Sequence, residues 1–171
     1  MKTFSFFFLF ALAFAACIQN EKTKKEAATA PDLYGQINAD SIKYDSVFAA
    51  KLGSDDYGMK QYVMAFLKRG PNRSQDSTTA ANLQKAHLEN IIRMANEGKL
   101  VVAGPFMDDW DVRGIYIFDV KTVEEARALT ETDPAIQAGR LAMDLHPWYG
   151  PAAMVLMAPL SKRLEKSSIV E

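Results

Sequence analysis

The chain places one histidine and one aspartate in settings that favour proton-transfer chemistry. The apolar residues around His87 recur at helical spacing, which predicts a helix from about residue 78 to residue 97 with His87 on its inner face. Asp133 opens a second, shorter helical turn that ends at Gly139. A histidine held by a carboxylate titrates near neutral pH and can act as a general acid or base. We therefore take His87 and Asp133 as the candidate catalytic pair.

Both residues also have sufficient structural roles. His87 shares its helix face with Leu83, Ile91 and Met94, so it could be a core histidine bonded to a backbone carbonyl. Asp133 precedes Pro134, and aspartate followed by proline is a favourable start for a helix. The two roles of Asp133 are compatible, because one carboxylate oxygen can cap the helix while the other faces His87.

Further polar residues are weaker candidates. Asp144 and His146 share one strand face, where they form either a second polar pair or an edge that faces water. A metal site made of both histidines with Asp133 and Asp144 is a weak candidate, because the chain has only two histidines and no free cysteine. Asp108, Asp109 and Asp111 resemble half of a calcium loop but lack its glycine and distal glutamate. Three arginines could meet an anionic substrate or be solvated: Arg69, Arg73 and Arg113. We expect no metal and no cofactor.

The elements that must position these residues follow from periodicity and turn signals. Strands are predicted at 61–68, 100–103, 114–120 and 141–146, with a further strand at 154–157, and helices at 47–52, 78–97 and 122–130. Thr122 and Glu125 form a capping box at the start of the last helix. The order of strand, helix, two strands, helix and strand predicts an α+β, ferredoxin-like βαββαβ fold with the helices on one face of an antiparallel sheet. The other face would lack intramolecular cover, which favours a homodimer formed sheet against sheet.

The first residues have the features of an export signal. An apolar run from Phe4 to Ala16 is too short to cross a bilayer as a helix, and it ends at Cys17, the single cysteine of the chain. We expect a signal peptide (1–16), a lipidated Cys17 with a flexible tether (17–31), an extension that packs on the domain (32–59), the domain itself (60–160) and a C-terminal tail (161–171). The mature protein would be an exported lipoprotein, facing the periplasm or the cell surface and held to the membrane by its lipid alone. The alternative is an ordinary secreted protein in which Cys17 occurs by chance.

Composition excludes several classes of function. Without Lys2 the chain has 19 basic and 21 acidic residues, a balance that argues against nucleic-acid binding. With Cys17 acylated, no thiol remains for a disulfide, a thiolate metal site or a nucleophile.

Several motifs, taken in order, resemble the YCII-related family over about residues 62–148. They are His87-Leu88, Glu97-Gly98, Ala103-Gly104-Pro105, the strand at 115–120, Val123-Glu-Glu-Ala126, Asp133-Pro134 and Ala138-Gly139. The resemblance implies a dimeric α+β barrel of ferredoxin-like topology and an active-site pair at His87 and Asp133. The family's activity is mostly undefined, and some relatives resemble muconolactone isomerases or dehydrochlorinases. Many members carry an aspartate at the end of the first strand, where this chain has Lys68 and Arg69.

Two functions remain open from the sequence. The first is a small-molecule enzyme of the lyase or isomerase type, in which His87 transfers a proton, Asp133 orients it, and Gly104, Pro105, His146 and Trp148 help to bind an unidentified ligand. The second is a non-catalytic binding or interaction lipoprotein on the same scaffold, because a fold does not by itself fix a function. The distance between His87 and Asp133, and the presence of a cavity beside them, discriminate between the two.

Overall fold

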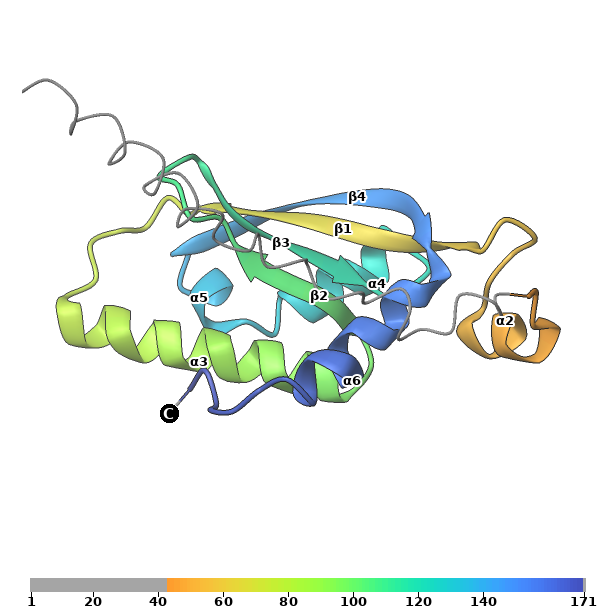
Figure 1. Ribbon diagram of the computed structural model, residues 1–171. Helices are drawn as coiled ribbons and strands as arrows, with labels where there is room; N and C mark the ends of the chain where they lie inside the picture. Colours follow the sequence, from red (N-terminus) through yellow and green to blue (C-terminus); the bar gives the residue numbers. More distant parts are fainter. Residues whose placement is uncertain (1–42, 171) are drawn as a thin grey trace, which may run out of the picture. The chain divides into compact units, whose positions relative to one another are not determined.

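The computed structural model describes residues 43–170, which contain one antiparallel sheet covered on one face by helices (Figure 1). Its strands are β1 (Met59–Arg69), β2 (Leu100–Pro105), β3 (Val112–Phe118) and β4 (Leu141–Pro151), in the spatial order β2-β3-β1-β4. The connecting helices are α3 (Ser77–Asn96), α4 (Val123–Thr130) and the short α5 (Pro134–Gln137). This confirms the predicted α+β fold with ferredoxin-like topology. The predicted leader, the lipidation site at Cys17 and the tether lie outside the described residues.

The core between the sheet and the helices follows from strand periodicity. Alternate residues of β1, namely Val63, Ala65 and Leu67, point to the helical face and are buried. Phe118 of β3 pairs with Val63 across the ladder, and Met94 of α3 packs into the same cluster. The predicted inner face of α3 is confirmed, because Met94 and His87 are both buried on it. The helical periodicity of the sequence thus brings His87 to the sheet.

Local sequence also fixes where the helices begin. The Asp76 carboxylate accepts hydrogen bonds from the amides of Thr78 and Thr79 at the start of α3. The Thr122 hydroxyl accepts from the Glu125 amide at the start of α4, and the Glu125 carboxylate reaches the Lys121 amide, one residue before the position that a capping box requires.

The second face of the sheet differs from its prediction. No strand forms at 154–157; these residues lie in the 3₁₀ helix η2 (Ala152–Leu156) and at the start of α6 (Met157–Lys162). The pairing of β4 with β1 ends at Pro151, which has no amide hydrogen to continue the ladder. Met154 and Val155 then pack against the buried cluster of Tyr62, Val101 and Ile117. One end of this face is therefore covered by the chain itself, and the prediction of a fully uncovered face was wrong.

The rest of the second face combines apolar and charged side chains. Met64 and Phe66 of β1 are half-buried there, and Phe66 meets His146 of β4 with 5.7 Å between ring centroids. Lys68 forms an ion pair with Asp144. Asp144 and His146 thus lie on the face opposite His87, so the four residues considered for a metal do not come together.

The part of the predicted extension that the structure describes includes α2 (Ser46–Leu52), which matches the helix predicted at 47–52. The helix is capped by Asp45 and contacts η2. Within residues 43–170, no helix combines the length and the apolar character needed to span a bilayer.

A close backbone approach joins the end of β1 to the start of β4. The Gly70 amide donates to the Arg140 carbonyl at 2.9 Å, and the Asn72 amide donates to the Gly139 carbonyl at 2.9 Å. A Cβ atom on Gly70 would lie 2.2 Å from the Gly139 carbonyl oxygen, so only glycine fits without a backbone shift. This contact holds the loop that follows β1 against Arg140.

Candidate active site

The structure brings the side chains of His87 and Asp133 together inside the domain. His87 Nδ1 lies 2.6 Å from Asp133 Oδ2, although the residues are 46 positions apart. Asp133 is fully buried and His87 is nearly so, with 6% of its surface exposed. A buried carboxylate requires a partner, and the imidazole supplies it.

The second oxygen of Asp133 fulfils the predicted structural role. Asp133 Oδ1 accepts a hydrogen bond of 2.8 Å from the amide of Ala135 at the start of α5. Since the ionised carboxylate can only accept, His87 donates from Nδ1, and its neutral form carries the acceptor lone pair on Nε2. Asp133 therefore acts on the imidazole by fixing its tautomer and orientation.

Tyr116 of β3 completes a chain of three polar groups. Its hydroxyl oxygen lies 3.3 Å from His87 Nε2, and the two rings are stacked with centroids 6.3 Å apart. Burial and, to a smaller extent, the charge of Asp133 raise the pKa of Tyr116. The phenol therefore stays protonated and donates to Nε2. Tyr116 was not identified as a site residue from the sequence. A tyrosine in the apolar strand at 114–120 needs a hydrogen-bond partner for its buried hydroxyl, and this requirement could have indicated its role.

We expect the two buried tyrosines to make folding sensitive to alkaline pH. Burial raises the pKa of Tyr62 to about 12, with a smaller contribution from Asp119, and that of Tyr116 rises as well. Below the ordinary value of 10.0 both states keep the proton; above it the unfolded chain loses the proton first, so the free energy of unfolding falls as pH rises. The slope is about 1.4 kcal/mol per pH unit for each tyrosine.

Urea unfolding across this pH range measures the effect. In Tyr116→Phe, the free energy of unfolding should fall less steeply with alkaline pH than in the wild type. The slope should be smaller by about 1.4 kcal/mol per pH unit, which corresponds to one proton. An unchanged slope would contradict the raised pKa of Tyr116.

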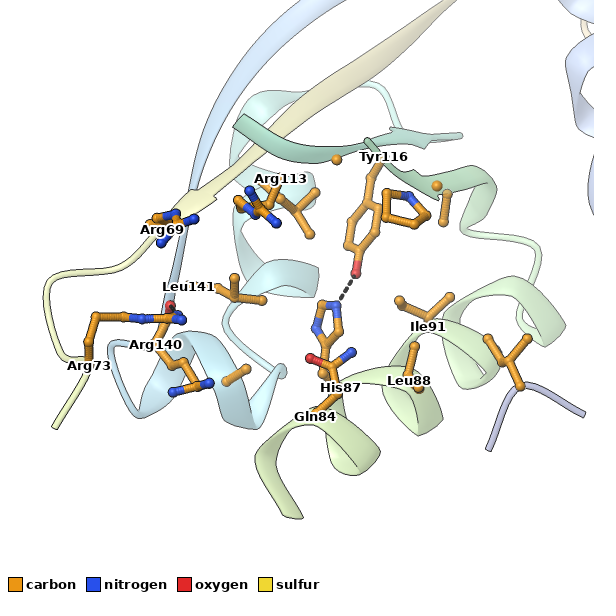
Figure 2. A pocket seen from close by; sticks show the side chains of 17 residues that line it. Arg69, Arg73, Gln84, His87, Leu88, Ile91, Arg113, Tyr116, Arg140 and Leu141 are labelled. Carbon is orange, nitrogen blue, oxygen red and sulfur yellow. Dashed lines mark hydrogen bonds between the residues drawn. The ribbon is translucent and has the colours of Figure 1, made fainter. Parts of the chain in front are cut away.

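A cavity of about 430 Å³ opens beside this chain of groups, between α3 and the inner face of the sheet (Figure 2). That volume is within the range of small-molecule sites. Its lining includes His87 and Tyr116, whereas Asp133 lies behind His87 and does not reach it. Proton-transfer groups and a binding space therefore occur together.

The residues predicted to bind substrate separate into two groups. Gly104 and Pro105, at the end of β2, line the cavity. His146 and Trp148 do not line it: His146 meets Phe66, and Trp148 lies against Tyr62 with 5.8 Å between ring centroids. Strand β4 turns these two side chains to the opposite face of the sheet, so they are not part of this site, contrary to the prediction.

Four arginines contribute to the cavity lining: Arg69, Arg73, Arg113 and Arg140. Arg69 and Arg113 share one carboxylate, that of Asp109, which Arg113 reaches at 3.0 Å. Asp109 belongs to the acidic turn compared above with half of a calcium loop, and it pairs with arginine. Among residues 43–170, no group of three or more potential metal ligands forms.

The tail after α6 adds one residue to the site. Ile169 lines the cavity together with Leu88 and Ile91 of α3. The predicted C-terminal tail is therefore in contact with the binding space.

The fold and the site together define a ferredoxin-like α+β domain with a buried histidine–aspartate pair at a cavity between helix and sheet. Residues 62–148, about half of the 171-residue chain, match the family model of the YCII-related domain. The chain belongs to this family.

A solved structure similar to the chain is 5-chloro-2-hydroxyhydroquinone dehydrochlorinase from Burkholderia phenoliruptrix AC1100, in complex with 2,5-dihydroxybenzoquinone. The two sequences are 20% identical, and the similarity covers 50% of this chain and 92% of the other, with a TM-score of 0.38. No curated protein sequence matches the chain.

Proposed function

We propose that the protein is a cofactor-independent enzyme of the lyase or isomerase type that acts on a small molecule. The observation that carries the proposal is the 2.6 Å contact between His87 Nδ1 and Asp133 Oδ2, with His87 and Tyr116 both lining the cavity. An imidazole fixed in one tautomer, with its basic nitrogen against a phenol that lines the same cavity, has the arrangement of a general base.

The proposed step is the removal of a proton from carbon. His87 Nε2 takes a proton from a carbon next to an electron-withdrawing group, and the electrons of that C–H bond form a new double bond. In a lyase the double bond expels a leaving group from the adjacent carbon, and in an isomerase the proton returns to another carbon. The Tyr116 hydroxyl, released from Nε2, can donate to an oxygen that gains negative charge.

The alternative function is non-catalytic binding in the same cavity. That function needs the space but does not need a tautomer-fixing carboxylate or a protonated phenol on the imidazole. The proposed enzyme uses the imidazole of His87, the carboxylate of Asp133 and the phenol of Tyr116. The two functions therefore differ in whether His87 is required once the ligand is bound.

His87→Gln is expected to abolish proton transfer, whereas His146→Gln is the matched control on the other face of the sheet. Because the reaction is unidentified, the assay follows exchange of C–H for C–D in D₂O by NMR over a panel of small carbon acids. The wild type and His146→Gln should exchange one or more panel members, and His87→Gln should be slower by about 10²–10⁴-fold. Full exchange by a folded His87→Gln would exclude the enzyme function.

The location of the protein is a separate proposal that rests on the Ala15-Ala16-Cys17 sequence after an apolar run. We propose that Cys17 is acylated and that the domain is displayed outside the cytoplasm on a lipid anchor. Metabolic labelling with a radioactive fatty acid tests this, and incorporation that persists in Cys17→Ser would contradict it.

The homodimer is likewise a proposal. It is supported by the half-buried apolar side chains of Met64, Phe66 and Ile115 on the part of the sheet that η2 leaves open. Light scattering coupled to size exclusion measures the assembly state, and a monomer at micromolar concentration would rule out the dimer.

A further inference from the structure

The cavity has a charged end built from parts of the chain that are distant in sequence. Arg69 ends β1, Arg73 follows in the next loop, Arg113 lies near the start of β3, and Arg140 directly precedes β4. Figure 2 shows their guanidinium groups on one side of His87. The backbone contact of Gly70 with Arg140 and the bond from Arg73 Nη1 to the Arg140 carbonyl, 3.2 Å, hold these segments together.

The positive charge at this end exceeds the negative charge that the described residues place against it. Asp109 serves both Arg69 and Arg113, and it is 83% exposed, so water weakens its effect. Arg73 and Arg140 bond to neutral acceptors, the Arg140 carbonyl and the Gln75 side chain, the latter at 3.1 Å. Although Arg73 is exposed, partial desolvation and the three neighbouring guanidinium groups lower its pKa. A cleft lined by one sign of charge concentrates ions of the opposite sign.

The other end of the cavity is apolar. Leu88 and Ile91 lie across His87 from the arginines in Figure 2, and Pro105 lines the same space. His87 and Tyr116 lie between the two ends. A ligand that satisfies both ends would carry an anionic group at one extremity and an apolar body at the other, with a carbon between them facing His87.

We propose that the cavity binds a small organic acid, with its carboxylate held by Arg73 and Arg140 and its apolar body against Leu88 and Ile91. Guanidinium groups match the planar carboxylate through paired N–H donors, and Arg73 and Arg140 have no carboxylate partner among the described residues. The placement of the reacting carbon at His87 rests on the proposed function, but the binding of the anion does not.

Calorimetric titration of the full chain in a mild detergent tests the proposal. The probes are benzoate, phenylacetate and 3-phenylpropanoate, each paired with its neutral amide, and phenyl phosphate as a tetrahedral anion. One or more of the anions should bind at least about tenfold more tightly than its neutral match, and added salt should reduce the difference. The double variant Arg73→Gln, Arg140→Gln should abolish the preference, whereas Arg127→Gln, on the exposed surface of α4, should keep it.

The outcomes separate this proposal from the function of His87. A preference for the anion that survives in His87→Gln supports the binding site even if no proton transfer is found. Tighter binding of phenyl phosphate than of every carboxylate would keep an anion site at the arginines but overturn the carboxylate assignment. Equal affinity for acid and amide, no binding of any probe, or a preference that persists in the double arginine variant would overturn the proposal.

Discussion

Replacing Asp133 by asparagine is expected to lower the rate of proton transfer by about 10²–10⁴-fold while the domain stays folded. The asparagine carbonyl can still accept from the Ala135 amide, which Asp133 Oδ1 does at 2.8 Å, so the start of α5 is retained. The amide NH₂ then faces His87 Nδ1 and donates to it. The imidazole proton must move to Nε2, and that nitrogen can no longer act as the base.

Two measurements together test this mechanism. The C–H exchange assay gives the rate, and ¹⁵N NMR of the histidine side chains gives the tautomer, with His146 as the internal reference on the other face of the sheet. We expect the His87 signals to change from the Nδ1–H to the Nε2–H pattern. A normal rate in Asp133→Asn, or a lost rate with an unchanged tautomer, would show that Asp133 does not act in this way.

Replacing Gly70 by alanine is expected to lower the free energy of unfolding by about 2–4 kcal/mol. The new Cβ would lie 2.2 Å from the Gly139 carbonyl oxygen, a backbone atom that cannot rotate away. The two strands must separate there, which weakens the hydrogen bonds of Gly70 to Arg140 and of Asn72 to Gly139. Because these bonds hold Arg73 beside Arg140, the same change should weaken anion binding.

Gly104→Ala is the matched control for this prediction. Gly104 also borders the cavity, but a Cβ atom there would meet nothing within 4 Å. Chemical denaturation of both variants should show a loss for Gly70→Ala and little change for Gly104→Ala. If Gly70→Ala and Gly104→Ala were equally stable, the backbone near Gly139 would have room for a Cβ atom at position 70, and the prediction would be wrong.

The parts of the fold that could be predicted from the sequence depend on local patterns. The spacing of Met94 and His87 fixes the inner face of α3, and the Asp133-Pro134 pair fixes the start of α5, because helix faces and caps depend on neighbouring residues. The segment at 154–157 was wrongly predicted because a short apolar run fits a strand or a helical turn equally well. Met154 and Val155 pack against a cluster from three strands, Tyr62, Val101 and Ile117, and local sequence does not show such tertiary contacts.

The site was predictable only in part for the same reason. Tyr116 meets His87 because the register of β3 against β1 places Ala65 opposite Tyr116, and this register is a tertiary property. Arg140 joins Arg73 through the approach of Gly70 to the backbone at 139–140, and a single glycine in a loop gives no hint of its partner. His146 and Trp148 were assigned to the site because the sequence does not tell which face of β4 meets the helices.

The two oxygens of Asp133 have a consequence for how this site can change in evolution. One oxygen supports folding by capping α5, and the other supports chemistry by holding His87. A descendant that lost the reaction would still be selected to keep the aspartate as a cap and the histidine as the partner of its buried carboxylate, whereas nothing in the fold would preserve the tyrosine hydroxyl. In surveys of related chains, a tyrosine at position 116 beside the pair is therefore the marker of retained activity, and the aspartate and histidine alone are not.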